Sequence, residues 1–429
     1  MPSQLSRSPP AWRRTPTLAL LTILLAADPA VAEPPISLLA PGATLEEVLT
    51  IGRRLSPELA ARALETEAAQ ARVAIAGSLA DPTLRITSDE IDRTSGPRQN
   101  KMFFTVEQEF PLWGKLDLRR DQANADVARS RADTRVTEAE LIEKVKVAFA
   151  QYYESDQAIR TTEDLHRVVH DMARVARDRY AQGRSSQQEV YKAEVEITRL
   201  AAEIVRLEAK RRSAIARLNA LLARPIDASL ARPVKLRALP QKAALAPDAL
   251  MQRARAGNPA LAGRDAQIAA AAAGKQLADK NWYPDVMLKA GAIDRTGNGP
   301  NGYLAEIGLR VPLQWSLHEA QQREAAAQVG AAQARRQAQE LQIQGELGEF
   351  LADFDGTRKT ADLIRTQLLP QSQALLRSGV AGYGLGRAEL VDVLRAEHDL
   401  ANLRIELLSA EFDQQRQLAA IERLIGGDL

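Results

Sequence analysis

The histidine and cysteine residues of this chain do not form the patterns that metal binding needs. His166 and His170 lie four residues apart, so on a helix they would share one face, as two ligands of a metal ion do. No glutamate accompanies His166 as it would in a zinc-peptidase helix. The chain has four histidines and no cysteine, and two exposed histidines on a helix surface are the commoner reason for such a pair. We therefore expect no metal site and no cofactor.

The sequence also lacks a phosphate-binding loop. It contains no Walker-type Gly-x-x-x-x-Gly-Lys, and no Gly-x-Gly-x-x-Gly follows a strand. Gly382-Tyr-Gly-Leu-Gly386 is rich in glycine, but it is expected between two helices, without the strand that such a loop needs. With neither convergent titratable groups nor a phosphate loop, the sequence predicts that the protein is not an enzyme.

The first 32 residues have the layout of a cleavable secretory signal. Arg7, Arg13 and Arg14 precede an apolar run over residues 17–27, and Ala30-Val31-Ala32 supplies the small residues of a cleavage site. The apolar run is too short for a retained membrane anchor, which takes about 20 residues. We therefore expect cleavage after Ala32 and export of the remaining chain.

The exported chain would be electrically neutral and free of cysteine. Loss of three arginines and one aspartate from 57 basic and 55 acidic residues leaves 54 of each, so no overall charge attracts nucleic acid. Without cysteine the chain has no disulfide, no thiolate metal site and no cysteine for a lipid anchor. Aromatic residues make up 4%, whereas Ala, Leu, Arg, Glu and Gln dominate, as in long helices. No later segment approaches the roughly 18 apolar residues of a membrane helix, so a membrane crossing would require strands closed into a barrel.

A repeat with an offset of about 202 residues organises the chain. Prolines and glycines recur wherever turns are needed, but chance does not keep them in one order at one spacing, so we infer an internal duplication. The matching landmarks, at offsets of 201 to 203, are Ser56-Pro57 with Asn258-Pro259, Asp81-Pro82 with Tyr283-Pro284, Asp92-Arg93-Thr94 with Asp294-Arg295-Thr296, Pro111-Leu112 with Pro312-Leu313, and Tyr180-x-x-Gly183 with Tyr383-x-x-Gly386.

Each half contains two segments in which apolar and polar residues alternate, the pattern of strands with two unlike faces. Asp92–Lys101 and Asp294–Gly302, between the paired segments, are predicted to be exposed hairpin loops. At about ten to twelve residues, the strands are long enough to cross a bilayer, although a soluble sheet on a core would alternate in the same way. The apolar positions are Leu84 and Ile86, then Met102, Phe104, Val106 and Phe110, then Val286, Leu288, Ala290 and Ala292, then Tyr303, Ala305, Ile307, Leu309 and Val311.

The strands in one chain are too few to close a barrel. Four strands leave two open edges, and lipid does not tolerate open sheet edges. Closure therefore requires several copies of the chain, and three copies would give about twelve strands.

A very long helix and a returning helix follow each pair of strands. Residues 115–182 contain no Gly or Pro, and as one helix they would reach roughly 100 Å. The returning helix over residues 185–224 carries an apolar heptad, and the second half repeats it 203 residues later, where Gln414 and Gln417 interrupt the seam. An ordinary antiparallel helix pair fits the same pattern. The seam positions are Val190, Ala193, Ile197, Leu200, Ile204, Leu207, Ala214, Leu218 and Leu221, and then Val393, Ala396, Leu400, Leu403, Leu407, Ala410, Ile421 and Leu424.

These features predict a mainly α-helical chain with a small transmembrane β part. After the signal at 1–32 we expect a first repeat over 33–224, a proline-rich linker over 225–247 and a second repeat over 248–429. The linker contains four prolines, so it cannot be one continuous helix.

Over its whole mature length the sequence resembles the TolC family of outer-membrane efflux proteins. Two motifs carry the resemblance together with the duplication: the stretch Phe104-Thr-Val-Glu-Gln-Glu-Phe-Pro-Leu-Trp-Gly-Lys115, and Tyr383-x-x-Gly386 followed by Leu390-Val-Asp-Val-Leu394. The resemblance implies a homotrimer in the outer membrane, with a twelve-stranded barrel and a long helical tunnel in the periplasm. It also implies two partners, an inner-membrane pump of the resistance-nodulation-division type and a periplasmic adaptor, or membrane fusion protein.

In such proteins the inner end of the tunnel is closed by coiled helices. The resemblance assigns this end to the tips at 180–188 and 383–391, and so predicts adaptor contacts at Tyr180, Gly183, Arg184, Tyr383, Gly386 and Arg387. Both glycines are also expected to have φ above zero, which the turn alone would require.

The resemblance also predicts a constriction near the start of the last helix. Asp392 matches a pore-facing acid of the family, and three copies of it would form an anionic ring that favours cations. An exposed carboxylate that simply stabilises the helix start is the alternative. Arg395 stands where better-known members have a second acid, so it could instead pair with Asp392 or Glu389 across subunits, and Arg387 could hold one helix to its neighbour.

The function implied is a passive exit duct of a tripartite efflux system. Phe110-Pro-Leu-Trp-Gly-Lys115 is similar to family members that serve heavy-metal pumps, which favours heavy-metal cations as cargo. A duct for drugs or for type I protein secretion is the alternative, and a soluble periplasmic coiled-coil scaffold or adaptor is a third possibility.

Overall fold

The computed structural model describes residues 41–89, 101–295 and 301–429. The expected signal at 1–32 and most of the two expected hairpin loops lie outside these residues. The description below concerns the unit formed by Pro41–Leu429.

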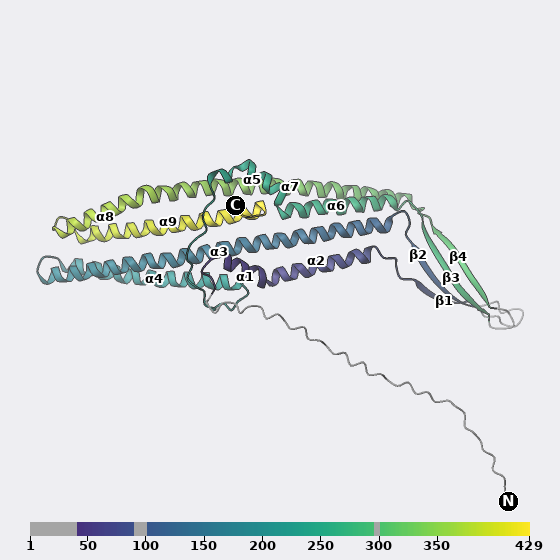
Figure 1. Cartoon of the computed structure of the whole chain (residues 1–429), viewed down its shortest axis with the longest axis horizontal. Coiled ribbons are helices and arrows are strands. Elements are labelled where there is room, and N and C mark those ends of the chain that lie inside the picture. The colour runs from purple at the N-terminus through teal and green to yellow at the C-terminus, as the bar shows by residue number, and fades with distance from the viewer. Residues whose placement is uncertain (1–40, 90–100, 296–300) are drawn as a thin grey trace, which may run out of the picture. The chain divides into compact units, whose positions relative to one another are not determined.

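The same order of elements occurs twice along the chain (Figure 1). Each half has two helices, two strands, a long helix and a returning helix. Two helices precede the strands in each half, because Ser56 and Asn258 each end one helix and cap the next, whose first residue is a proline. The first half contains α1 (Leu45–Leu55), α2 (Pro57–Ala76), β1 (Thr83–Asp89), β2 (Lys101–Phe110), α3 (Lys115–Ala181) and α4 (Gln187–Leu221). The second contains α5 (Pro247–Gly257), α6 (Pro259–Lys280), β3 (Asp285–Arg295), β4 (Gly302–Arg310), α7 (Trp315–Leu363), the π-helical turn η2 (Ile364–Leu368), α8 (Leu369–Gly384) and α9 (Leu390–Ile425).

The four strands form one antiparallel sheet in chain order, β1-β2-β3-β4. The register places Val106 opposite Leu84 and Ala290, and Ala290 opposite Ala305. The apolar positions of all four strands therefore share one face, which confirms the predicted alternation. On the other face, Glu107 lies opposite Lys289, and Lys289 lies opposite Glu306. At seven and nine residues, β1 and β4 are shorter over the described residues than the predicted length.

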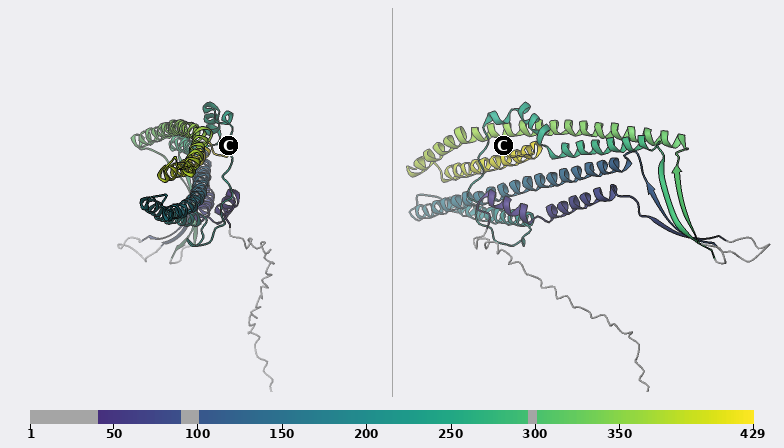
Figure 2. Two further views of the ribbon diagram at one scale, coloured as in Figure 1. Left: turned by 90° about the vertical axis from the view of Figure 1, so that its left-hand side faces the viewer. Right: turned by 45° about the vertical axis from the view of Figure 1, so that its right-hand side comes forward.

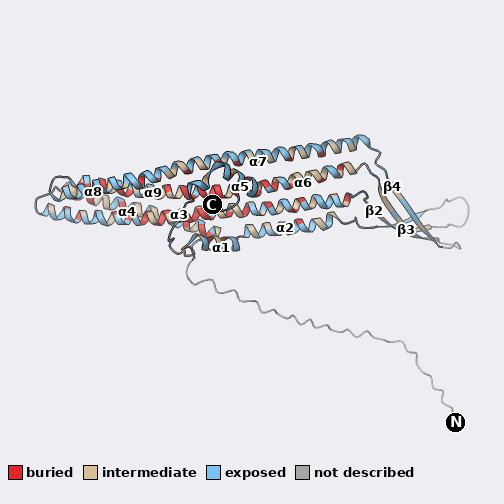
Figure 3. Cartoon of the chain, turned by 45° about the horizontal axis from the view of Figure 1, so that its top comes forward, coloured by how far each residue is buried: buried red, intermediate tan, exposed pale blue. Residues whose placement is uncertain are grey.

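The long helices pack side by side, with α3 in contact with α4, α6 and α9 (Figures 1 and 2). Burial follows the sides on which the helices meet, whereas α7 is exposed over most of its length (Figure 3). The predicted heptad is confirmed at its buried members, among them Val190, Ala193 and Leu200 in α4 and Val393, Ala396 and Leu400 in α9.

The two glutamines in the second seam are buried and are accommodated by one threonine of α7. The Gln414 amide donates to the Thr357 carbonyl at 3.4 Å, and the Gln417 amide donates to the Thr357 hydroxyl at 3.3 Å. The interruption seen in the sequence is thus a polar contact between α9 and α7 rather than a break in packing.

The linker between the halves crosses the long helices (Figure 1) and is not helical, except for the short 3-10 turn η1 (Lys242–Leu245). Its backbone pairs with the segment before α1, where Ala231 donates to Pro41 at 3.0 Å and Val234 donates to Ala43 at 3.1 Å. The Tyr152 hydroxyl of α3 donates to the Ala231 carbonyl at 3.1 Å. These bonds hold the linker against the middle of the first hairpin.

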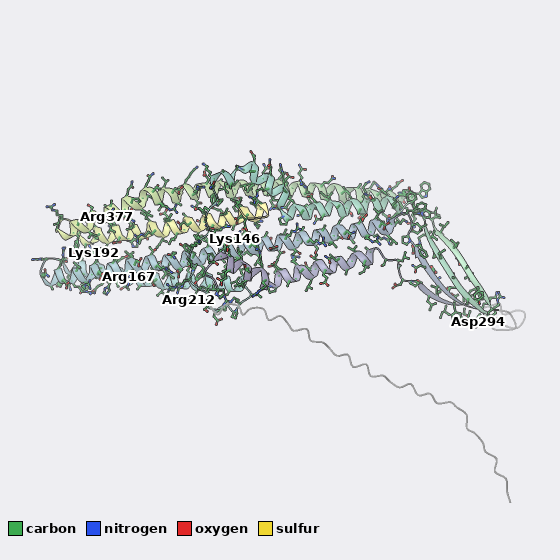
Figure 4. All side chains as sticks on the ribbon, viewed as in Figure 1. Lys146, Arg167, Lys192, Arg212, Asp294 and Arg377 are labelled. Atoms are coloured by element: carbon green, nitrogen blue, oxygen red, sulfur yellow. The ribbon has the colours of Figure 1, made fainter. Side chains whose placement is uncertain are left out.

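A cluster of buried charges joins the two halves near the middle of the helices, where Figure 4 labels Lys146. Lys146 of α3 and Glu422 of α9 are each 4% exposed at the side chain, and the ammonium lies 2.8 Å from the carboxylate. Arg237 of the linker also donates to Glu422, at 2.5 Å, and the Leu429 amide donates to its other oxygen at 3.1 Å. Lys146 pairs in addition with Asp428. We call these five residues the clasp.

Candidate functional site

The two hairpins end in turns of the same construction. In the first, Gly183 donates to the Tyr180 carbonyl at 2.9 Å and Arg184 donates to the Arg179 carbonyl at 2.9 Å. In the second, the same bonds run from Gly386 to Tyr383 at 3.1 Å and from Arg387 to Gly382 at 2.9 Å. Gly183 has φ +71° and Gly386 has φ +75°, so the predicted positive φ values are confirmed. Each turn satisfies the last carbonyls of its outgoing helix.

A contact between the hairpins lies beside these turns. The Arg179 guanidinium of α3 stands 4.2 Å from the centre of the Tyr383 ring, and both of its Nη atoms donate to the Tyr383 carbonyl at 3.2 Å. Burial raises the pKa of the Tyr383 phenol, although Arg179 opposes that rise. The Tyr383 hydroxyl is buried and has no hydrogen-bond partner among the described residues. Arg179 therefore ties the tip of the second hairpin to the first through both charge and ring stacking.

The three residues predicted at the constriction lie on the first turns of α9. Glu389 is the N-cap residue, but its side chain makes no cap hydrogen bond, and Asp392 stands in the first turn. Asp392 and Arg395 are both exposed. Within the part of the chain that the structure describes, no ion pair joins any of these three residues. In one chain they are thus near one another but unpaired.

Arg395 faces a groove between α4 and α9. The groove has a volume of about 690 Å³, and Arg395 shares its lining with Lys192 and Arg199 of α4. It also contains His398 of α9, whose Nδ1 lies 3.4 Å from the Glu196 carboxylate of α4. Asp392 does not line this groove. The groove is therefore amphipathic: it carries three cationic side chains against one carboxylate, and Tyr191, Val195, Val391 and Leu394 supply its apolar lining.

A second site lies where the strands join the helices. Trp113, just after β2, stacks on Tyr283 with ring centres 5.2 Å apart, and its indole donates to the Pro284 carbonyl at 2.9 Å. Trp282 meets Trp315 edge to face at 6.2 Å. Three of the four tryptophans of the chain thus lie at this junction, together with a tyrosine.

The same junction contains a buried ion pair. Lys115, the first residue of α3, is 4% exposed at its side chain and donates to Asp285 at 2.8 Å and to the Tyr283 carbonyl at 2.9 Å. The chain turns sharply before it, since Trp113 has φ 64° and Gly114 has φ 76°. This lysine therefore fixes the angle at which α3 leaves the sheet.

The described residues bear on the expected absence of a metal site and on the histidine pair. Among them, no group of three or more His, Cys, Asp or Glu side chains is placed to hold a metal ion. His166 and His170 lie on α3 and His170 is exposed.

None of the described helices combines the length and the apolar content that crossing a membrane takes.

The structure brings together residues that sequence reasoning did not connect. The tip residues Tyr180, Gly183, Arg184, Tyr383, Gly386 and Arg387 do lie in two matching turns. Arg179 was missed because it belongs to no motif, and the clasp was missed because 276 residues separate Lys146 from Glu422. The tryptophans carried a usable signal, because each stands at the helix side of a predicted strand.

Comparison with known proteins gives one curated relative and several solved structures of the same fold. Protein CyaE of Bordetella pertussis is 30% identical over 179 residues, which cover 40% of this chain but only 37% of CyaE. The outer membrane protein VceC of Vibrio cholerae is similar over 90% of this chain and 96% of its own, with a TM-score of 0.76 and 19% identity. The open-state MtrE outer membrane channel of Neisseria gonorrhoeae covers 90% of both chains, with a TM-score of 0.74 and 16% identity. At these identities the structural likeness establishes the fold alone.

The family comparison covers far more of the sequence. The pattern described as "Outer membrane efflux protein" matches residues 53–224 and 250–427, one match in each half of the duplicated chain. These two segments contain the strands, the long helices and both tip turns. The chain therefore belongs to the outer membrane efflux protein family.

Proposed function

We propose that this protein is one subunit of a homotrimeric outer-membrane exit duct of a tripartite efflux system. The duct conducts cargo passively from an inner-membrane pump and a periplasmic adaptor to the outside of the cell, and it performs no catalysis. The observation that carries this proposal is the two-faced sheet, whose apolar face is exposed in the single chain and is bordered by aromatic residues at its helix end.

The apolar face of the sheet has the character of a lipid-facing surface. Tyr303 is 93% exposed, Ile307 76% and Leu84 68%. A soluble sheet would bury such a face on a core, but no described helix covers it. Trp113 and Trp315, which are 51% and 66% exposed, lie where the sheet meets the helices, the place that aromatic residues take at a membrane interface. This supports a sheet that sits in the outer membrane with its helices in the periplasm.

The polar face of the sheet suits a water-filled interior. Lys289 lies 3.3 Å from Glu306, Arg85 lies 3.5 Å from Glu107, and Arg310 lies 2.6 Å from Glu109. The first two pairs bridge neighbouring strands, and the third spans from β2 to β4 across β3. Charged residues on this face and apolar residues on the other are the division expected of a barrel that conducts water-soluble cargo.

The edges of the sheet support assembly from several copies. In the described chain, β1 and β4 are the first and last strands of the sheet, and each has a partner on one side only. Unpaired backbone groups are not tolerated in lipid, so β4 of one copy pairs with β1 of the next, and three copies close a twelve-stranded barrel.

The helices carry an independent argument for the same assembly. Leu394 and Ala401 of α9 are buried in a cluster that includes α3. Their repeat matches on α4, 203 residues earlier, are Tyr191 and Thr198, and Tyr191 is 56% exposed. Val205, two helical turns beyond Thr198, is 61% exposed. If the duplication extends to packing, this stripe of α4 lies against a long helix of a neighbouring copy, as α9 lies on α3 within one chain.

At the inner end of the tunnel we assign the gate to the tips of the hairpins. Three copies of Asp392 form an acidic constriction that favours cations. The absence of any partner for Asp392, Arg395 or Glu389 within the described chain leaves all three available to a neighbouring subunit. The tip residues Tyr180, Gly183, Arg184, Tyr383, Gly386 and Arg387 contact the adaptor.

For the cargo we propose heavy-metal cations, because the stretch from Phe110 to Lys115 is similar to the heavy-metal subgroup. Drugs and secreted proteins are the alternatives. Deletion of the gene would then sensitise the cell to particular metal ions and leave its sensitivity to drugs unchanged. Sensitivity to drugs alone, or loss of a secreted protein, would assign the cargo to one of the alternatives.

Assembly and conductance test the duct itself. The exported chain is expected to need detergent for extraction from the envelope, to migrate as a trimer in mild detergent and to produce discrete conductance steps in a planar bilayer. A matched variant, Val205→Asp, keeps the hairpin but places a charge on the α4 stripe, so it should migrate as a monomer. Extraction without detergent, as a monomer, would instead support the soluble scaffold and end the duct proposal.

A further inference from the structure

The long helix of the second half contains a turn that its counterpart in the first half lacks. At η2 the Leu369 amide donates to the Ile364 carbonyl, five residues earlier, whereas an α-helix uses a spacing of four. In the first half, α3 is α-helical through all of its 67 residues. The π-helical turn is therefore a defined difference between the duplicated hairpins.

The repeat offset changes at the same place. Before η2, buried residues of α3 and α7 match at an offset of 202: Leu141 with Ile343, Val145 with Leu347, Tyr152 with Phe354, and Ile159 with Ala361. Beyond η2 the offset is 203: Tyr180 with Tyr383, Gly183 with Gly386, and Val190 with Val393. The second half thus holds one extra residue between Ala361 and Tyr383, the stretch that contains η2.

An extra residue inside an α-helix would turn every later side chain by about 100° around the axis. The face of α8 that contacts α9, and the tip turn, would then point away from α9. The π-helical turn takes up the extra residue within one turn, so the two tips keep the same construction despite the insertion. We therefore interpret the π-helical turn as the place where the helix accommodates the inserted residue.

The helix beyond this turn is weakly fastened. Pro370, the second residue of α8, has no amide hydrogen, so one carbonyl of the preceding turn loses its helical donor. The Thr366 hydroxyl donates back to the Asp362 carbonyl at 2.6 Å, a bond that tends to bend helices. No residue of α8 is buried, whereas the matching part of α3 buries Val169, Ala173 and Ala176.

The residues before and beside the turn are held firmly. Ala361 and Ile364 are each 1% exposed. Arg365, within η2, lies 2.8 Å from Glu411 of α9. At its far end, α8 meets the first hairpin through the contact between Arg179 and Tyr383. Between these two points α8 also packs along α9, but it buries none of its own residues, so the segment has the features of a movable arm.

We propose that η2 is a hinge, and that α8 bends there to open the tip when the Arg179–Tyr383 contact is released. The proposal rests on the proposed function for its consequence, the opening of a duct. Its mechanical part does not, because the bending of α8 can be measured on the folded chain whether or not that chain conducts.

Hydrogen exchange tests the mechanical part. In wild-type protein the amides of α8 should exchange faster than those of the matching stretch of α3, residues 166–181. Deletion of Thr366 removes the extra residue, so the helix becomes continuous with its faces still in phase. Pro370→Ala restores a donor without changing the length. Each variant should slow exchange in α8 roughly five-fold for every hydrogen bond regained, and Thr366→Ala, which keeps the turn, should change it little.

Single-channel recording tests the consequence. Arg179→Gln should raise the open fraction, and adding the Thr366 deletion or Pro370→Ala should reverse that rise. Exchange in α8 that is as slow as in α3, or that neither variant slows, would overturn the hinge. Slowed exchange with an unchanged open fraction would overturn its role in opening. A protein that never conducts but shows the exchange pattern would refute the proposed function and leave the hinge standing.

Discussion

Replacing Lys146 by methionine tests whether the clasp holds the two halves of the chain together. The Lys146 and Glu422 side chains are each 4% exposed, so their mutual attraction is little screened by water. Removing one partner of such a pair costs about 3–5 kcal/mol, mainly because the other charge stays buried. Glu422 keeps Arg237 and the Leu429 amide as donors, so we expect the lower end, about 3 kcal/mol.

That loss is measurable as a shift of the melting temperature. At about 2.1 cal/mol/K per residue, a folded unit of about 390 residues has an unfolding entropy near 0.8 kcal/mol/K, so 3 kcal/mol lowers Tm by about 4 °C. Circular dichroism in mild detergent follows the transition. Lys144→Met is the matched control, since Lys144 is exposed two residues away on the same helix and should change Tm by less than about 1 °C.

A double-mutant cycle makes the reasoning refutable. Glu422→Gln should destabilise the wild-type chain by more than it destabilises the Lys146→Met chain, with a coupling of at least about 1 kcal/mol. If Lys146→Met has the same Tm as the Lys144→Met control, the clasp does not hold the halves together. The same conclusion follows if the destabilisations by Lys146→Met and Glu422→Gln are simply additive.

The clasp is also expected to make the stability of the folded chain depend on pH in the acid range. The hydrogen bond from Lys146 lowers the pKa of Asp428 below its ordinary value. A carboxyl group whose pKa is lower in the folded state stabilises that state above its unfolded pKa, near 4, and loses the contribution as pH falls through the folded pKa. Tm of the wild type should therefore fall more steeply below about pH 4 than that of Lys146→Met, and parallel curves would exclude this linkage.

Three further outcomes are expected. Lys115→Met leaves Asp285 without its cation at the strand–helix junction, which should cost about 1–3 kcal/mol and be visible as a lower Tm of the detergent-solubilised protein. Asp392→Arg should reduce the cation preference measured from reversal potentials in a salt gradient, and an unchanged preference would remove Asp392 from the constriction. Arg395→Glu should change leakiness of cells to large antibiotics if this residue pairs across subunits, whereas normal exclusion would leave it with no such role.

Local patterns in the sequence were enough to predict the strands, the long helices and their order, but not the turn η2. Alternation at positions such as Phe104 and Val106 identified β2 because side chains of a strand point to opposite faces. The heptad at Val190 and Ala193 identified the face of α4 that packs on α3. Positive φ at Gly183 and Gly386 followed from the need of a tight turn for a residue without Cβ.

Contacts between distant segments could not be predicted in this way. No periodicity links Lys146 to Glu422 or Arg179 to Tyr383, because each pair is formed only when whole helices pack. The interruption at η2 did leave a trace, since the repeat offset slips from 202 to 203 between the strands and the tips. A change of one residue in the repeat offset is too small to interpret from the sequence alone. It can be assigned to an insertion only because the structure has a π-helical turn in the same stretch.

The open edges of the sheet have a consequence for how the protein forms. In the proposed barrel, β1 and β4 of the described chain gain their second partners only from neighbouring copies, so part of the folding would be a reaction between molecules. The rate of that step rises with the amount of protein delivered to the membrane, and dilution favours the unpaired form. Slow supply of the chain should therefore prolong the lifetime of exposed strand edges, which is when aggregation or cleavage competes with assembly.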